Sequence, residues 1–566
     1  MMKMRRTILS VLSVMALAAS GAVGTVSAQN GINSRVEVER DYDGSIARAV
    51  KSPLDAPVDD SLLNFKLRFD YTTFYSPYKD LYEFSPVMTL GPASEGRVVY
   101  PWLYARVAAA YPWTPSADVY ITPRLGERFS FGVYFNHDSY WGKVPAAVYS
   151  GNAVTYPGQQ IKGDRMSNRS GAFFGYRWTK GELRMDASYT GGMYALTPVY
   201  GAPSGSAAYN SQDRLRASIS VRSTNADPSS FYYKADIGYR YFNNRRGVPE
   251  HLADADLSLG ATIKGDHRLY VRLGGTFTTV TVGNTSPSRG LWNISPVYTW
   301  GKDRWMVRAG LVFSSVYGDC VRKNGSSFMI YPDASVNFEA ARNALWLYFK
   351  ASGDNSLYTR YDLYALNPWM EDSGRAYQSA VPVSLELGLK GLVLDRFSYS
   401  LGINYSRTAN RLSFMALQYN YSWYQMVNWA DSDVLMVTGT LKWKSPSFYA
   451  KAELNYRGFS NWKAALMTPA FDVEAVMEYN LRQRLFIRAD CYFRTSSTGL
   501  SAVPYTEASV YLVPAFVDVG LRISYAVNPH VLVFLEGNNL ANNKIQYFLN
   551  YVEPGINIGA GICLKL

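Results

Sequence analysis

The sequence predicts an all-β fold: a transmembrane antiparallel β-barrel of about 22 strands. Three observations lead to this prediction. The chain of 566 residues begins with an export signal, apolar and polar residues alternate in many segments of strand length, and short turns alternate with longer connections. Successive side chains of a strand point to opposite faces, so the alternation gives each strand one apolar and one polar face.

Residues 1–28 are predicted to form a secretory signal peptide. Cations precede the apolar stretch of residues 8–19, and small residues precede a cleavage site after Ala28, which is the usual order in such signals. A retained amphipathic helix is the alternative interpretation. No later window holds about 18 uninterrupted apolar residues, which argues against a helical membrane span. An exported chain of this kind is either a soluble periplasmic or secreted protein or a membrane barrel.

The composition favours the barrel. Aromatic residues make up 15% of the chain, with 45 Tyr and 13 Trp, and membrane barrels place such residues as girdles at both interfaces. The net charge is +12 and falls to +9 without the three cations of the signal. The basic residues are dispersed along the predicted strands, which disfavours a nucleic-acid partner and favours a positive lumen or a rim that faces lipopolysaccharide. The three Cys have no metal-ligand spacing, and we expect Cys491 and Cys563 to face lipid.

The last segment, residues 556–566, is the clearest strand. Every second residue is apolar and the residues between are small or polar. Its length is about what a tilted strand needs to cross the hydrocarbon of a bilayer. We predict that this segment closes the barrel by pairing with the strand that starts near Trp102.

Short polar turns and longer connections give the strand count. Ten short turns with both chain ends on the same side imply 11 hairpins, or about 22 strands. The predicted turns are at residues 126–127, 180–181, 227–229, 265–266, 301–303, 342–343, 395–396, 445–447, 482–483 and 528–529. The clearest longer connections are predicted at residues 145–164, 196–212, 354–378 and 415–432.

The polar faces of the strands carry many charged residues. A water-soluble sandwich would also alternate, with its charged face outside. The export signal, the aromatic content and the number of strands favour the apolar face outside and the charges inside. In that orientation the candidate lumen-facing charges are Arg184, Asp186, Arg216, Arg222, Lys234, Asp236, Arg272, Arg308, Lys451, Glu453, Arg488, Asp490, Asp518 and Arg522.

The C-terminal residues resemble the end of TonB-dependent receptor barrels. Asn538 to Tyr547 is similar to their Asn-Leu-x-Asn-x-x-Tyr turn, and Tyr551 to Gly555 leads through Pro-Gly into a terminal alternating strand. Residues 38–42, followed by Lys51 and Pro53, resemble the N-terminus of a subgroup of these barrels that lacks the plug domain. The resemblance implies a 22-strand barrel without a separate plug domain, inserted by the barrel-assembly machinery.

The predicted organisation is a signal peptide (1–28), a periplasmic N-terminal segment (29–100) and an outer-membrane β-barrel (101–566). The first functional hypothesis is a porin-like channel or transporter that passes or binds solutes across the bacterial outer membrane, with selectivity set by the inward charges. The alternative is a structural or assembly barrel that binds partner proteins through its periplasmic segment or through aromatic loops around Trp369 and Trp423. Outer-membrane lipid and lipopolysaccharide are the expected surroundings.

No catalytic, cofactor-binding or metal-binding residues are predicted. The four His (His137, His251, His267 and His530) show no metal-ligand spacing. His137 and Asp138 form the one His–acid pair of interest, and a barrel hydrolase would also need a Ser nucleophile placed beside the His. The sequence therefore predicts that the protein is not an enzyme and needs no cofactor.

Overall fold

The computed structural model describes residues 102–566, apart from residues 124, 127, 151, 200–207, 224–230, 245–247, 265, 282–284, 319–326, 343, 372–376, 394–395, 420 and 504–506. The predicted signal peptide and the predicted periplasmic segment lie outside the described residues.

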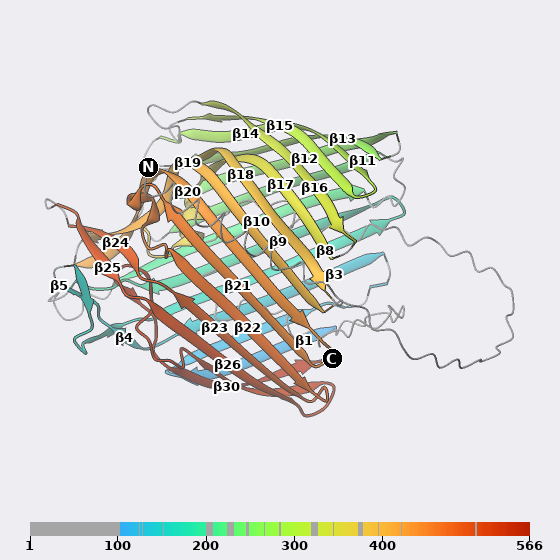
Figure 1. Cartoon of the computed structure of the whole chain (residues 1–566). Helices are drawn as coiled ribbons and strands as arrows, with labels where there is room; N and C mark the ends of the chain where they lie inside the picture. The colour runs from blue at the N-terminus through green and yellow to red at the C-terminus, as the bar shows by residue number, and fades with distance from the viewer. Residues whose placement is uncertain are drawn as a thin grey trace, which may run out of the picture. The chain divides into compact units, whose positions relative to one another are not determined.

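Twenty-two antiparallel strands form one closed barrel (Figure 1). The first strand pairs with the last, from Tyr104 opposite Lys565 to Tyr111 opposite Ile558, and this pairing closes the ring. The predicted fold class, strand number and closing strand are confirmed. The barrel strands are β1 (Leu103–Tyr111), β2 (Thr114–Ile121), β3 (Phe129–Tyr140), β8 (Arg165–Trp178), β9 (Gly181–Ala195), β10 (Tyr209–Ser223), β11 (Tyr232–Asn244), β12 (Glu250–Lys264), β13 (His267–Val280), β14 (Ser288–Lys302), β15 (Trp305–Tyr317), β16 (Phe328–Ala341), β17 (Leu345–Tyr358), β18 (Tyr377–Val393), β19 (Phe397–Tyr419), β20 (Ser422–Lys444), β21 (Phe448–Phe459), β22 (Phe471–Leu481), β23 (Leu485–Arg494), β26 (Phe516–Ala526), β27 (Val531–Asn538) and β30 (Asn557–Lys565).

Nine of the ten predicted turns lie at the junctions of consecutive strands at one end of the barrel, where β1 begins and β30 ends, and the tenth, at residues 227–229, lies outside the described residues. We call this the turn end and the opposite end the loop end. One predicted loop is wrong: residues 415–432 are the distal parts of β19 and β20, which pair from Phe397 opposite Trp443 to Tyr419 opposite Ser422. This stretch contains no Gly or Pro to interrupt the ladder, so the two strands continue as a long hairpin.

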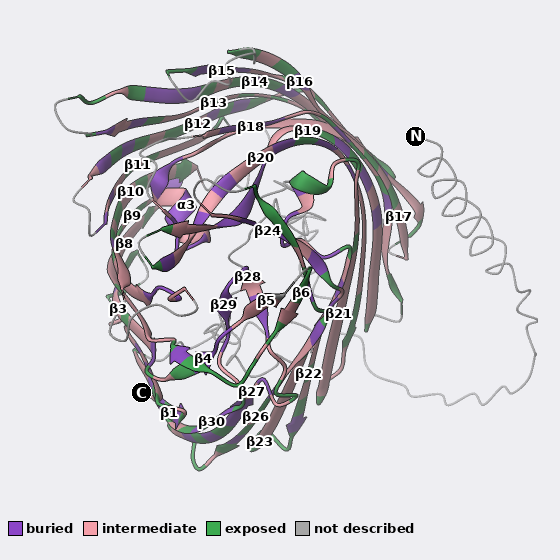
Figure 2. Cartoon of the chain, turned by 90° about the vertical axis from the view of Figure 1, so that its left-hand side faces the viewer, coloured by how far each residue is buried: buried purple, intermediate pink, exposed green. Residues whose placement is uncertain are grey.

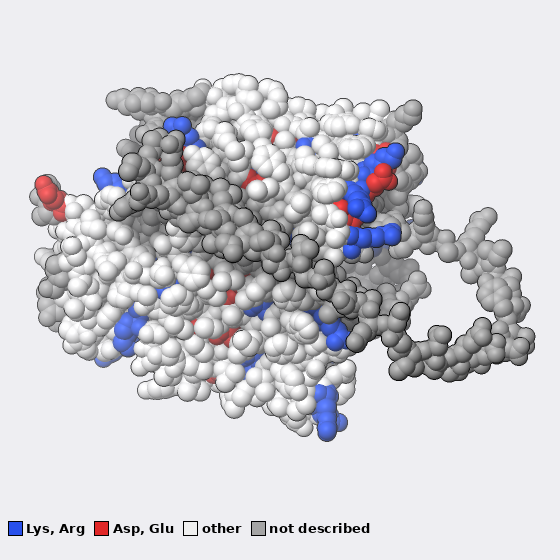
Figure 3. Space-filling model, viewed as in Figure 1, with Lys and Arg blue, Asp and Glu red and all other residues white. Residues whose placement is uncertain are grey.

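Apolar side chains cover the outer face of the wall. Large apolar residues that point outward are exposed along many strands, for example Ile237 at 65% and Leu535 at 60%. The outer side in Figure 3 is mostly uncharged, with conspicuous groups of charge toward its two ends. No helix among the described residues is long and apolar enough to cross a membrane. Cys491 is exposed as expected, but Cys563 is buried beside Phe534, because it follows Gly559 and Gly561 on the inward parity of β30.

Short elements occupy the loop-end connections. Seen from the loop end, α3, β28 and β29 lie within the ring of strands (Figure 2). These connections contain β4 (Lys143–Pro145), β5 (Val148–Ser150), β6 (Ala153–Thr155), β7 (Gln160–Lys162), α3 (Arg360–Leu366), the 3-10 helix η2 (Trp462–Ala465), β24 (Ser497–Ala502), β25 (Ser509–Val513), β28 (Gln546–Phe548) and β29 (Tyr551–Val552).

A capping box starts helix α3. The Thr359 hydroxyl accepts from the Asp362 backbone N–H, and the Asp362 carboxylate accepts from the Thr359 backbone N–H. This reciprocal pair satisfies backbone groups that a short helix would otherwise leave open. The helix ends at Leu366, before Asn367 and Pro368. The local sequence therefore defines a helical turn inside a connection between two strands.

Candidate functional site: a charged lumen beneath a folded lid

One contact shows which side chains of the strands point into the barrel. Arg240 of β11 donates from Nη1 to Asp362 of α3, at 2.7 Å, inside the ring. Its register partner on β10 is Arg216, and cross-strand partners share a face of the sheet. Following the registers from strand to strand around the barrel extends this inward face to every wall strand.

The predicted charges lie on this inward-pointing face of the strands. Cross-strand partners show which residues share the inward face of Arg240. The pairings of β8 to β16 place the first part of the set on this face, and those of β20 to β26 place the rest there. The residues placed there are Arg184, Asp186, Arg216, Arg222, Lys234, Asp236, Arg272, Arg308, Lys451, Glu453, Arg488, Asp490, Asp518 and Arg522.

Many of these charges form ion pairs along the wall. Four pairs join residues two apart on one strand, with nitrogen–oxygen distances of 3.2, 2.8, 2.7 and 3.5 Å: Arg184–Asp186, Lys234–Asp236, Lys451–Glu453 and Arg488–Asp490. Four pairs form across strands, namely Arg222 with Glu182, Arg308 with Asp333, Arg488 with Glu478, and Arg522 with Glu536. Except for Arg522–Glu536, whose carboxylate is buried, both side chains of each pair are partly exposed. Such pairs contribute little to stability, typically under about 1 kcal/mol, and remain accessible to a solute.

Arg216 and Arg272 differ from the other cations. Among the described residues, neither has an ion-pair partner within 4.0 Å. Arg216 is exposed and stands opposite Arg240, while Arg272 stands opposite Ser258 and Ser295. The two guanidinium groups therefore leave net positive charge on the wall formed by β10 to β14.

Sequence reasoning missed a buried ion network beside the closing strand. Arg106 of β1 contacts Asp118 of β2 at 3.0 Å and Glu536 of β27 at 3.2 Å, and Glu536 also accepts from Arg522 at 2.8 Å. The side chains of Arg106 and Glu536 are each 3% exposed. Arg106 reaches Glu536 across β30, whose inward residues Gly559 and Gly561 have no side chains in the way. A lone acid, Glu536, directly after the apolar stretch 531–535 is the sequence signal for this network.

A folded lid lies at the loop end of the lumen. We define the lid as residues 196–199, 359–371 and 545–552. Its core joins side chains far apart in the sequence, because Trp369 stacks on Tyr551 with ring centroids 4.4 Å apart and contacts Phe548 edge-on. The buried residues of this core, with those of the strands around it, are Leu196, Phe242, Leu363, Tyr364, Trp369, Met370, Leu412, Phe414, Val427, Phe548 and Tyr551.

Polar contacts anchor the lid to the wall. Glu250 of β12 accepts from the Tyr361 backbone N–H at 2.8 Å, and the Trp369 indole donates to the carbonyl of Ala195 at 3.1 Å. Backbone hydrogen bonds also join Trp369 and Glu371 to Gln425 of the long hairpin. Burial raises the pKa of Tyr551 well above its usual range, so its hydroxyl stays protonated and donates to the carbonyl of Trp423.

The aromatic loops proposed for partner binding are part of this packing. Trp369 is only 7% exposed, and Trp423 packs partly buried against a neighbouring cluster that contains Leu549. Trp369 is buried in the lid rather than exposed on a loop, because aromatic side chains bury apolar surface against one another. Among the described residues no group of three or more His, Cys, Asp and Glu could hold a metal ion.

Comparisons with known proteins agree on the fold. No protein-family model matches the sequence, and no curated protein matches it. Solved structures do match. The FrpB iron transporter of Neisseria meningitidis superposes with a TM-score of 0.63 at 10% identity, over 83% of this chain and 82% of that one.

Two receptors of Pseudomonas aeruginosa are also similar. The ferripyoverdine receptor of the outer membrane has a TM-score of 0.60 at 10% identity, over 83% of this chain and 72% of that one. The ferric enterobactin receptor PfeA has a TM-score of 0.60 at 12% identity, over 82% and 81%. At such identities the likeness shows the fold alone, a large antiparallel β-barrel like the barrels of these outer-membrane proteins.

Proposed function

We propose that this protein is an outer-membrane transporter or receptor barrel, in which solutes pass along the charged lumen and the lid controls entry from the loop end. The observation that carries the proposal is the combination of an apolar outer wall, an inward face rich in charge and a folded lid at one mouth. The similar structures support it, since their names describe an iron transporter and receptors for iron chelates.

The proposal assigns the two mouths to different parts of the chain. The lid restricts the loop end. Residues 29–100 are predicted from the sequence to be a periplasmic segment without a plug domain, and we propose that this segment restricts the other mouth. A barrel of 22 strands is wide enough that its lumen must be filled or covered to be closed.

Planar-bilayer recording tests this assignment. We expect the full-length barrel to conduct weakly and a variant that lacks residues 29–100 to carry a larger current, because one of the two restrictions is removed. A barrel that stays sealed in both forms would contradict the proposal. Circular dichroism and heat-modified mobility on gels are the controls that test whether both forms are folded.

Arg216 and Arg272, the two cations of the predicted set that have no ion-pair partner among the described residues, predict the sign of the selectivity. Replacing both Arg216→Gln and Arg272→Gln should move the reversal potential in a salt gradient toward cations. We expect a change of about two- to fivefold in the permeability ratio, since a unit charge in water at 4 Å from an ion contributes about 1 kcal/mol. The matched control is Arg184→Gln with Lys234→Gln, which also removes two positive charges from the inward face, but from cations that have carboxylate partners. If the two double variants shift the potential equally, Arg216 and Arg272 have no special role.

A further inference from the structure

Three polar residues on the outer face of the wall lie in the order nucleophile, base and orienting group. His137 Nε2 is 3.0 Å from Ser139 Oγ, and His137 Nδ1 is 2.7 Å from Asn168 Oδ1. His137 and Ser139 are two apart on β3, so they share one face, and Asn168 stands opposite His137 on β8. Asn136, which directly precedes His137, points into the barrel, where it donates to Asp118. The three residues therefore point outward.

The hydrogen bonds select the useful tautomer of the imidazole. An N–H at Nδ1 donates to the Asn168 oxygen, which leaves the lone pair of Nε2 directed at the Ser139 hydroxyl. This is the arrangement in which a histidine acts as a general base toward a serine, and an asparagine can serve as the third member. The Ser139 hydroxyl also lies 3.3 Å from the carbonyl of Pro115, so its proton has two acceptors within reach.

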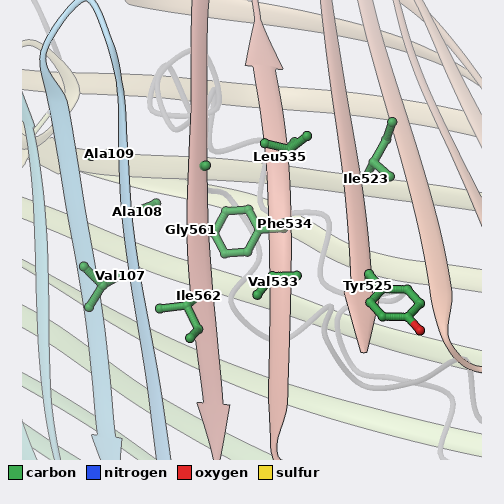
Figure 4. Close-up of a pocket in the computed structure, with 11 residues that line it drawn as sticks. Val107, Ala108, Ala109, Ile523, Tyr525, Val533, Phe534, Leu535, Gly561 and Ile562 are labelled. Carbon is green, nitrogen blue, oxygen red and sulfur yellow. The ribbon is translucent and has the colours of Figure 1, made fainter. Parts of the chain in front are cut away.

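An apolar groove lies on the same face of the wall. It has a volume of about 660 Å³, a size typical of ligand sites, and is lined across β26, β27, β30 and β1 by residues that include Leu535, Ala560 and Ala109 (Figure 4). Ala560 pairs with Leu535 on one side and with Ala109 on the other.

The row of small residues continues from the groove to the serine. Ala109 pairs with Pro115 on β2, and the carbonyl of Pro115 contacts Ser139 on β3. Two strand spacings of about 4.8 Å separate Ala109 from Ser139, so a chain that lies in the groove can place its head group at the serine.

The aromatic residues near Ser139 indicate its depth. Tyr111, Trp113 and Trp141 are exposed at the loop ends of β1, β2 and β3, at 83%, 60% and 38%. Exposed Tyr and Trp mark the interface where lipid head groups meet acyl chains. Ser139 lies two residues from Trp141 toward the barrel middle, at the level expected for the ester bonds of a lipid.

We propose that Ser139, His137 and Asn168 form an acyl-ester hydrolase site on the lipid-facing wall, with the apolar groove holding the acyl chain. Ser139 Oγ attacks the ester carbonyl and its proton passes to His137 Nε2. The carbon–oxygen bond to the alcohol breaks, and the alcohol leaves with the proton from His137. Water then attacks the acyl-serine, gives a proton to His137 and releases the fatty acid, while Ser139 regains its proton. Asn168 is the positioning residue that holds the imidazole.

The resting site is shielded, since Ser139 is 1% exposed. An ester reaches the hydroxyl by displacing the side chains that cover it, which keeps water away until a lipid is bound. The expected substrates are therefore long-chain esters presented in a membrane or micelle rather than small soluble esters.

Labelling of the full-length protein in detergent micelles tests the proposal. A long-chain alkyl fluorophosphonate should modify one serine, and peptide mass spectrometry should place the adduct on Ser139. Ser139→Ala and His137→Asn should each lose the labelling and at least about 100-fold of the hydrolysis rate on a long-chain nitrophenyl ester. Ser170→Ala is the matched control, because Ser170 is an outward serine of β8 next to Asn168 in that face and should change neither readout.

Two further variants separate a catalytic from a structural role. Asn168→Asp keeps an acceptor for Nδ1 and should retain most of the rate, whereas Asn168→Ala should reduce it. Ala109→Phe narrows the groove and should raise KM for a long-chain ester while leaving KM for a butyryl ester unchanged. Absence of labelling in the folded wild-type barrel, labelling that persists in Ser139→Ala, or equal effects of Ala109→Phe on both esters would overturn the proposal.

Discussion

Replacing Glu536 with alanine is expected to destabilise the barrel by about 3–5 kcal/mol, because it leaves Arg106 buried without one of its carboxylate partners. Glu536 joins Arg106 and Arg522, and its side chain is only 3% exposed. The loss also weakens the seam, since the network ties β1 to β27 across the closing strand β30. Urea unfolding in micelles, followed by tryptophan fluorescence, measures the effect.

Glu453→Ala is the matched control for this substitution. Glu453 also faces the lumen and pairs with one cation, Lys451, at 2.7 Å, but its side chain is 36% exposed. Solvent screens such a pair, so we expect a change below about 1 kcal/mol. Equal destabilisation by the two substitutions would show that the network at the seam is not a special contributor.

Gly561→Val should prevent the barrel from closing properly. A Cβ at Gly561 would meet the Phe534 ring, the Val107 carbonyl oxygen at 2.7 Å and the Ala108 Cβ at 2.8 Å. Two of these atoms belong to or adjoin the backbone of β1, so the strand itself would have to move. Overpacking of this kind costs about 1–3 kcal/mol or more, and here it acts at the one strand pair that closes the ring.

The fraction of folded protein in membranes measures this defect, since a folded barrel resists denaturation by SDS until it is heated. The control is Gly274→Val on β13, which is also an inward glycine in a strand but whose Cβ would have only the Asp256 carboxylate nearby, at 3.8 Å. We expect near-normal folding for this control. Similar yields for both variants would contradict the importance of the small residues at the seam.

The wall of the barrel could be predicted because its signals are local. Gly, Asn, Asp or Pro occurs within a few residues of each turn, and apolar and polar residues alternate with a period of two along the wall strands. This is why the nine turns that the structure describes and the closing strand were placed correctly. The long hairpin of β19 and β20 was mistaken for a loop because its polar and aromatic residues alternate poorly, and only the pairing of the two strands shows its structure.

The lid could not be predicted because its contacts are long-range. Trp369 and Tyr551 stack although 182 positions separate them, and Arg240 meets Asp362 across 122 positions. The residues next to each of these side chains in the sequence do not indicate which distant residue it will contact. By contrast, Ser139 lies two residues after His137, and on a strand this spacing places both on one face, so that pair could have been found in the sequence.

The measurement that most directly tests the account is the single-channel current of Trp369→Ala in planar bilayers, compared with the wild type and with Trp462→Ala. Trp369 is the centre of the lid core at 7% exposure, and its truncation should loosen the lid by about 3–5 kcal/mol. Trp462 is 45% exposed on η2 and is the matched control. If the lid governs entry to a charged lumen, Trp369→Ala will open more often or conduct more, in the presence and in the absence of residues 29–100, while Trp462→Ala will behave as wild type. An unchanged current in Trp369→Ala in both backgrounds would contradict the account.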